Sequence, residues 1–388
     1  MTLIFAIVLF LAVSAICLNV AFGERMISRL KDVMLDEQAN TKVSIIVAAL
    51  NEADTIEPAL NSLLSIDYKN LEIIVVNDRS TDATSTILER IANDEPRLRV
   101  VHIDTLPLGW LGKNHALQQG AKIASGDHIL FTDADVIFAP DVVSRAVAYC
   151  RLHQVDHLAL LFDVVAQTQL LRIMLLSFAI AFMARFQPWK VNDSPNRFVG
   201  LGGFNMVRRD AYLAAGGHAA IPMAVLDDLA LGQLMKMKGY RQHVLLGKDM
   251  VCVEWYRNTP ELSKGLEKNI FAAFDYSIGR LASLTVLMLL TRVWPWLALL
   301  ITEGPVWILS LATVIAGLML HAHFLMKRGW SLRCLVFAPV VPLLELWMWW
   351  KGSLLTLARG GIVWRDTFYP LSKIKAAHAK SKSFFEGG

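Results

Sequence analysis

Short apolar runs alternate with segments of helical periodicity over residues 42–275. Uninterrupted apolar runs rich in β-branched residues predict strands, and apolar residues recurring every three to four positions predict helices. Repeated strand–helix–strand units predict an α/β fold with a mainly parallel sheet and helices on both faces. In such sheets ligands bind beyond the carboxyl ends of the strands. Strands are expected at 43–47, 71–76, 99–103 and 128–132, and helices at 53–64, 81–91, 114–124 and 229–237.

Long apolar blocks lie on either side of this region. Residues 2–22 form an uncharged run that is long enough to cross a bilayer. No basic stretch precedes the run, which favours a membrane anchor over a cleaved signal peptide. Residues 281–324 are long enough for two spans, with Gly304 and Pro305 at the turn. Residues 334–350 contain two prolines and a glutamate, which predicts a kinked or re-entrant segment.

Composition agrees with a membrane protein. The 388 residues are 55% hydrophobic and 19% charged, which is too apolar for an ordinary soluble protein. Lys and Arg follow the first apolar run and the 281–324 block, and this places the middle of the chain in the cytoplasm. The formal charge of +4 is concentrated beside the apolar segments and indicates anionic headgroups, not nucleic acid, as a partner. The expected division is an anchor at 1–23, a linker at 24–41, a cytoplasmic domain at 42–275, a membrane region at 280–357 and a basic cytoplasmic tail at 358–388.

Two carboxylates follow the strand expected at 128–132. Asp133 and Asp135 are spaced i, i+2, and both can turn toward one cation where the chain bends at the end of a strand. Oxygen ligands suit Mg²⁺ or Mn²⁺, and such ions usually accompany a phosphate. An isolated D-x-D pattern is more often a solvated loop. The metal interpretation therefore depends on what else reaches this edge of the sheet.

Further polar residues are expected at the same edge. Asn51 and Glu52 follow the first strand, and Asp78 follows the second, where its carboxylate offers acceptors for a uracil or a ribose. One such cluster alone is commonly a helix N-cap, whereas three clusters at one edge predict a binding site. Lys113 lies beside Gly112 at the start of an expected helix, an arrangement that suits a phosphate.

Two later patterns carry candidate chemistry. The glycines at 200, 202 and 203 have no strand before them, so they do not form a dinucleotide-binding fingerprint. They predict a close approach of the backbone to a sugar. Asp227 and Asp228 open the helix expected at 229–237, and two interpretations stay open. The acids complement the helix dipole, or one is a general base whose pKa is raised by burial and by its neighbour.

The order of these motifs resembles that of family 2 glycosyltransferases with the GT-A fold. The resemblance covers residues 42–274 and rests on VSIIVAALNE, VVNDRSTD, GWLGKNHAL, FTDAD, GGFNMVRRDAY and VLDDLAL. The apolar ends and the tail sequence GGIVWR are similar to the membrane-bound branch that contains ceramide glucosyltransferases and bacterial carotenoid- and hopanoid-associated transferases. The resemblance implies an inverting hexosyltransferase in the inner membrane of a bacterium, with its catalytic domain in the cytoplasm. Its donor would be a nucleotide sugar such as a UDP-hexose, its acceptor a membrane lipid hydroxyl, and its cofactor Mg²⁺ or Mn²⁺.

The resemblance also implies roles for individual residues. Asp228 matches the catalytic base, with Asp227 in the preceding acidic position, and Asp133 and Asp135 match the metal ligands. Lys268 is a candidate for an additional charge on the diphosphate. The resemblance implies that Asp133 binds substrate as well as metal. The other substrate-binding residues that it implies are Ala49, Asn51, Glu52, Asp78, Gly112, Lys113, Gly202 and Gly203.

One departure from the resemblance bears on the acceptor. Processive synthases and ceramide glucosyltransferases carry a Q/R-x-x-R-W motif after the base, whereas residues 265–269 read GLEKN here. This argues against the first alternative, a processive membrane polysaccharide synthase. The second alternative is a catalytically inert membrane scaffold on the same fold, and the clustered carboxylates argue against it.

Overall fold

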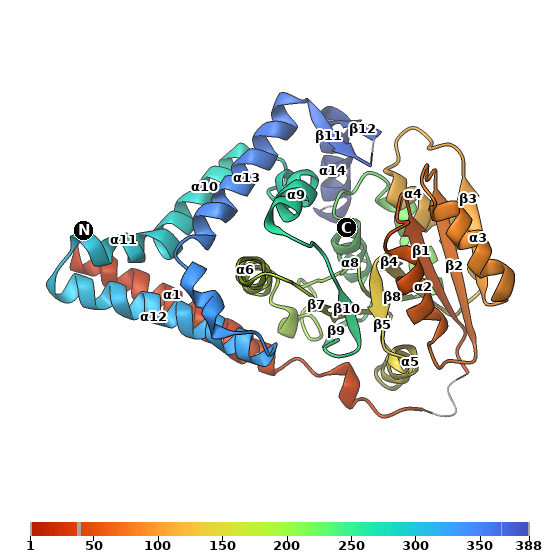
Figure 1. The fold of residues 1–388 in the computed structure, drawn as a ribbon, viewed down its shortest axis with the longest axis horizontal. Coiled ribbons are helices and arrows are strands. Elements are labelled where there is room, and N and C mark those ends of the chain that lie inside the picture. Colours follow the sequence, from red (N-terminus) through yellow and green to blue (C-terminus); the bar gives the residue numbers. More distant parts are fainter. Residues whose placement is uncertain (1, 37–39, 366, 387–388) are drawn as a thin grey trace. The chain divides into compact units, whose positions relative to one another are not determined.

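The computed structural model describes residues 2–36, 40–365 and 367–386, and the chain divides into two compact units (Figure 1). We call the first the helical unit. It contains the N-terminal residues up to Met26, together with Ala166–Gln187 and Tyr256–Ile362. We call the second the α/β unit. It contains Ile27–Val165, Pro188–Trp255 and the C-terminal residues from Val363 onward.

A seven-stranded sheet in the order β3-β2-β1-β4-β8-β6-β9 forms the centre of the α/β unit. β8 runs antiparallel to both of its neighbours, and the other neighbouring strands are parallel. The mainly parallel sheet and the four expected strands are therefore confirmed. The strands are β1 (Val43–Ala49), β2 (Leu71–Asp78), β3 (Leu98–Ile103), β4 (His128–Asp133), β6 (His157–Leu161), β8 (Asn205–Arg208) and β9 (Gln242–Leu246).

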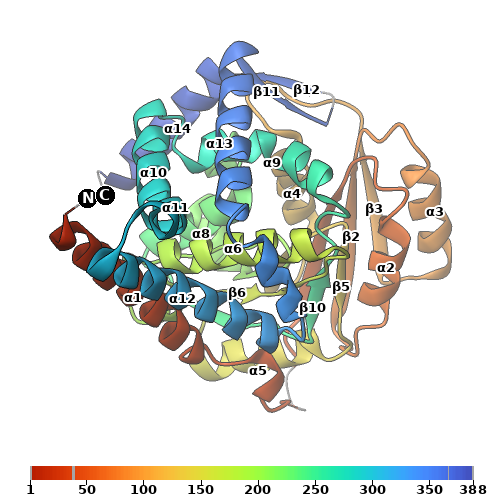
Figure 2. The same cartoon turned by 60° about the vertical axis from the view of Figure 1, so that its left-hand side comes forward.

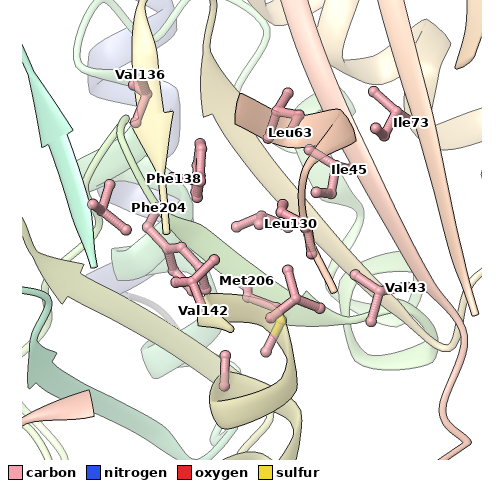
Figure 3. Packing of buried hydrophobic residues seen from close by; sticks show 14 of the residues in the cluster. Val43, Ile45, Leu63, Ile73, Leu130, Val136, Phe138, Val142, Phe204 and Met206 are labelled. Atoms are coloured by element: carbon pink, nitrogen blue, oxygen red, sulfur yellow. The ribbon is translucent and has the colours of Figure 1, made fainter. Parts of the chain in front are cut away.

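Successive residues of the central strands pack against helices on opposite faces, because side chains alternate along a strand. In β1, Ile45 belongs to a core formed with α2, α3 and α5, which includes Leu63 (Figure 3). Its neighbour Ile46 belongs to a second core formed with α4, α7 and α8. Each of these two residues is fully buried. The helices are α2 (Ile56–Leu64), α3 (Thr84–Asp94), α4 (Gly112–Ile123), α5 (Val142–His153), α7 (Arg209–Ala215) and α8 (Asp227–Met237).

Smaller elements complete the α/β unit, which contains the last two residues of β11. A three-stranded sheet has the order β5-β10-β7, and β11 pairs with β12. The last helix of the chain, α14, follows β12 directly. β11 to α14 lie within the segment expected from the sequence to be only a basic tail. The bounds are β5 (Val136–Phe138), β7 (Asp163–Val164), β10 (Val251–Val253), β11 (Gly361–Trp364), β12 (Thr367–Pro370) and α14 (Leu371–Glu386).

The helical unit contains four helices that are long and apolar enough to cross a membrane: Leu3–Arg25, Gln169–Lys190, Ile278–Ile301 and Gly304–Lys327. α1 and α12 lie side by side (Figures 1 and 2). The two helices expected within 281–324 are present, and the chain turns at Thr302 and Glu303, just before the predicted Gly304. The unit is built from α1 (Leu3–Arg25), α6 (Gln169–Phe186), α9 (Thr259–Ala273), α10 (Ile278–Met288), α11 (Trp294–Ile301), α12 (Gly304–Lys327) and α13 (Val341–Ala358).

Two charged side chains among these apolar helices, Arg292 and Glu24, have ion-pair partners. Arg292 lies in a short π-helical segment between α10 and α11, and its guanidinium donates to Glu345 in α13 at 2.6 Å. The same guanidinium donates to the Ser177 hydroxyl in α6. Glu24 at the end of α1 pairs with Lys327 at the end of α12. These contacts join helices that are distant in sequence and lower the cost of placing charge among apolar side chains.

Candidate active site

A pocket lies at the carboxyl ends of β1 and β2, where a parallel sheet is expected to bind its ligand. Four of the predicted site residues line it, namely Ala49, Asp78, Gly112 and Lys113. Three lining residues, Trp364, Arg365 and Tyr369, come from the C-terminal segment and were not predicted from the sequence. The pocket is lined by Ala48, Ala49, Leu50, Asp78, Arg79, Gly112, Lys113, Trp364, Arg365 and Tyr369.

The loops that follow β1 and β2 are tied to each other. Asn51 has a left-handed backbone with φ 55°, its amide donates to the Ser80 hydroxyl at 3.0 Å, and its side-chain oxygen accepts from the Thr81 amide at 2.8 Å. The contact of Asn51 with the second loop shows that it holds the loop geometry. Glu52, the next residue, accepts a hydrogen bond from the Arg365 guanidinium.

Asp78 ends β2 and is 2% exposed. Its two carboxylate oxygens accept from the Arg79 guanidinium at 2.8 and 3.0 Å, which compensates its buried charge. Gly112, the first residue of α4, approaches this pair so closely that a Cβ there would lie 2.5 Å from Asp78 Oδ2. The Gly112 amide donates to the Tyr369 hydroxyl at 3.1 Å. A side chain at 112 would therefore displace the Asp78–Arg79 pair from the pocket.

Lys113 joins two of the predicted acidic motifs. Its ammonium lies 2.7 Å from Asp133 Oδ1 and 3.1 Å from Asp227 Oδ2. Burial lowers the pKa of Lys113, but the carboxylates of Asp133, Asp227 and Asp228 outweigh burial and hold its pKa above the usual value for lysine. The D-x-D segment at the end of β4 and the acidic pair at the start of α8 thus surround one permanent positive charge.

Gly202 connects Asp228 with Asp133 through its backbone. Its amide donates to Asp228 Oδ2 at 2.8 Å, and its carbonyl accepts from the Asp133 amide at 3.1 Å. Asp228 Oδ1 accepts from the Leu229 amide at 2.7 Å, in the first turn of α8. Burial is the main cause that raises the pKa of Asp228 to about 6; the Asp227 carboxylate contributes to the rise, and the Lys113 ammonium opposes it. Such a carboxyl group is poised to accept a proton near neutral pH.

Asp135 lies among other carboxylates. Burial raises its pKa to about 7, and the charges of Asp133 and Glu52 contribute to the rise. A bound divalent cation would relieve this repulsion, and carboxylate oxygens are donors that Mg²⁺ and Mn²⁺ accept. No group of three or more His, Cys, Asp or Glu side chains that could hold a metal occurs among residues 2–36, 40–365 and 367–386. The acids present fit a cation whose remaining ligands come from water or from a phosphate.

The remaining predicted residues lie in two places. Gly203 is beside Gly202, and its carbonyl accepts from the Thr132 hydroxyl at 3.0 Å. Lys268 lies on α9 in the helical unit, where its ammonium donates to Asn269 at 3.1 Å. Its role toward a diphosphate stays a prediction.

Replacing Gly200 by alanine should destabilise the protein. A Cβ at this buried position would overlap the backbone carbonyl of Asp228, which cannot move without moving α8. Overpacking of this kind costs about 1–3 kcal/mol. We expect a lower melting temperature, measured by circular dichroism. Gly317→Ala in α12 is the control, because a Cβ there has no neighbour within 4 Å; equal melting temperatures for the two variants would contradict the expectation.

Two curated proteins are similar to just under a third of the chain. An uncharacterized glycosyltransferase of Haemophilus influenzae is 35% identical over 116 residues, which are 30% of this chain and 34% of that protein. A poly-β-1,6-N-acetyl-D-glucosamine synthase of Staphylococcus aureus is 34% identical over 110 residues, which are 28% of this chain and 25% of the synthase. The chain thus aligns with only about a third or a quarter of the length of these relatives.

The fold also has a counterpart among solved structures. A mannosyltransferase from Pyrobaculum calidifontis, solved with GDP-mannose and Mn²⁺, superposes with a TM-score of 0.54 at 20% identity. The superposition covers 92% of this chain and 98% of the mannosyltransferase, which supports the GT-A-like α/β fold expected from the sequence. The family model described as glycosyl transferase family 2 matches residues 44–214. The residues that it matches include the first two strand ends, Lys113 and the D-x-D segment.

Proposed function

We propose that this chain is an inverting, metal-dependent glycosyltransferase that moves a hexose from a nucleoside-diphosphate sugar to a hydroxyl of a membrane lipid. One observation carries the proposal. The Gly202 amide donates a hydrogen bond to Asp228, and the Gly202 carbonyl accepts one from the Asp133 amide. Lys113 pairs with both Asp133 and Asp227. Asp228, which is suited to deprotonate an acceptor, and Asp133, which is suited to bind the metal ion of the donor diphosphate, are thereby held at one site.

The reaction requires one proton acceptor and a stabilised leaving group. Asp228 takes the proton from the acceptor hydroxyl while the acceptor oxygen forms a bond to C1 of the sugar. The bond between C1 and the diphosphate oxygen breaks, and the nucleoside diphosphate leaves with the electron pair. Lys113 stabilises the charge that develops on it, and fixed charges of this kind commonly supply the largest part of catalysis. A divalent cation held by Asp133 and Asp135 would neutralise further charge on the diphosphate.

The apolar helices support a lipid acceptor. Four helices of the chain have the length and composition of membrane spans. An enzyme anchored in this way works beside the bilayer, where the hydroxyl of a lipid headgroup is the most concentrated acceptor. The same helices and the basic residues beside them support a location in the inner membrane of a bacterium with the α/β unit in the cytoplasm.

A polysaccharide synthase is the second candidate, and it is favoured by the similarity to the staphylococcal synthase. The two candidates differ in the product. A lipid transferase adds one sugar to an extractable lipid, whereas a synthase releases or extends a chain of many sugars.

Labelled nucleotide sugars distinguish these functions. Membranes that contain the protein would be incubated with UDP- and GDP-sugars, with and without Mn²⁺ or Mg²⁺, and then extracted with organic solvent. We expect metal-dependent label in the lipid fraction, as a single-sugar product. Label in an aqueous polymer would support the synthase, and absence of transfer with every donor would contradict both candidates.

The transfer rate should depend on pH through Asp228. The base must be deprotonated, and its pKa is raised to about 6. The measurement would be made at saturating Mn²⁺, so that protonation of Asp135 does not contribute to the pH profile. Under this condition kcat/KM should fall about tenfold per pH unit below the pKa of Asp228 and stay constant above it. A profile that is flat between pH 5 and pH 7 would exclude Asp228 as the base.

A further inference from the structure

The C-terminal segment forms one wall of the pocket at the strand ends. Trp364 at the end of β11, Arg365 after it and Tyr369 in β12 line the pocket together with Asp78 and Lys113. All three lie outside the residues matched by the family model, which end at position 214. This wall is therefore added to the family 2 domain by a part of the chain about 150 residues further on.

Tyr369 fixes the wall in place. It is 6% exposed, and its hydroxyl accepts a hydrogen bond from the Gly112 amide at the start of α4. Leu371 and Ile374 of α14 are buried as well, at 8% and 1% exposure. The segment that carries Arg365 is thus packed into the α/β unit on its C-terminal side, which keeps the guanidinium close to the pocket.

Three cations line the pocket, and they differ in how firmly they are held. Arg79 is bidentate to the buried carboxylate of Asp78, and Lys113 has two carboxylate partners. Arg365 has Glu52, and the two side chains are 38% and 19% exposed. Arg365 is the most exposed of the three cations, since the Arg79 and Lys113 side chains are 24% and 19% exposed. An ion pair of a partly exposed cation contributes little to stability, so Arg365 can exchange its partner at a lower cost than the other two. Of the three cations that line the pocket, Arg365 can most easily leave its carboxylate partner and bind a ligand.

We propose that Arg365 binds the diphosphate of the nucleotide donor, exchanging its contact with Glu52 for phosphate oxygens. A guanidinium presents paired N–H groups that match a phosphate, and such charge-assisted contacts are among the strongest hydrogen bonds in proteins. Trp364 and Tyr369 form the fixed surface beside it. The inference rests on the proposed function, because the donor is the diphosphate in question. The proposal gives the C-terminal segment a role in donor binding, through a positive charge that lies outside the residues matched by the family model.

Ligand titrations test the assignment. The full chain in detergent with MnCl₂ would be titrated calorimetrically with UDP and GDP, and with uridine and guanosine. For the diphosphate that the wild type binds, Arg365→Ala should weaken the affinity about tenfold to a hundredfold. The affinity for the matching nucleoside should be unchanged. Arg365→Lys, which keeps the charge but not the fork of N–H groups, should fall between wild type and Arg365→Ala.

Controls separate binding from folding. Lys373→Ala removes the same charge from an exposed position on α14, and it should leave both affinities unchanged. Melting temperatures show whether each variant is folded. An equal loss of affinity for nucleoside and diphosphate in Arg365→Ala would show a structural role and overturn the inference, as would an unchanged affinity for the diphosphate. If the wild type bound neither UDP nor GDP, the proposed function would fail together with the inference.

Discussion

Asp228→Asn should abolish sugar transfer and leave donor binding intact. Asparagine keeps the shape of the side chain, and its oxygen can still accept from the Gly202 amide, but it cannot take a proton from the acceptor. Losing a proton acceptor at the reacting group costs about 10²–10⁴ in rate. The loss should appear in kcat at saturating donor, with the affinity for the nucleoside diphosphate unchanged in titration calorimetry.

A matched substitution controls for the loss of one negative charge. Asp249→Asn removes a carboxylate that is 54% exposed, where it pairs with Lys31. Its backbone is left-handed, with φ 64°, and asparagine adopts this conformation readily. The control should transfer sugar at the wild-type rate. Turnover of Asp228→Asn within a few-fold of wild type would show that another group takes the proton.

The strands and the edge that carries the site could be predicted from the sequence. Largely apolar runs such as Val43–Ala49, in which Ser44 is the one polar residue, indicate burial on both faces, because apolar residues occur at successive positions and successive side chains point to opposite faces. The starts of helices were less accurate. α2 begins at Ile56, three residues after the predicted start, because the amides of Thr55 and Ile56 first bond to the Glu52 carbonyl in a turn. Local periodicity contains no information about such turns.

Contacts between distant residues could not be predicted in the same way. Lys113 was expected to face a diphosphate, and this role stays a prediction. The structure shows that its ammonium pairs with Asp133 and Asp227, which belong to two different motifs. The C-terminal wall is a stronger case. Tyr369 bonds to Gly112 across 257 positions, in a segment whose composition indicated only a basic tail. The tail sequence GGIVWR was the one signal, and it was interpreted as family similarity and not as part of the pocket.

The acidic cluster has consequences for stability that oppose its use in catalysis. Asp135 lies beside the charges of Asp133 and Glu52, and burial raises its pKa to about 7. A carboxyl group whose pKa is raised on folding favours the protonated form, so its ionised form destabilises the fold. The penalty is absent at low pH, grows as the pH rises from the usual range of aspartate, and is complete above about pH 7. Without metal, the site is therefore least stable in the pH range where the enzyme would work.

Asp135→Asn should for this reason change activity and stability in opposite directions. Removing one of the two proposed metal ligands should weaken Mn²⁺-dependent donor binding, and it should lower the transfer rate about 10²–10³-fold, the usual cost of losing one stabilising group. The metal-free variant should melt at a higher temperature than wild type at pH 8, with the difference vanishing as the pH approaches 4. Metal titrations of transfer, together with melting curves at both pH values, measure the two effects, and Asp249→Asn should show neither. A carboxylate that binds the cation cannot be replaced by a neutral amide without loss of affinity. If transfer by Asp135→Asn depended on Mn²⁺ as it does in the wild type, Asp135 would therefore not be a metal ligand, whatever the effect of the substitution on melting.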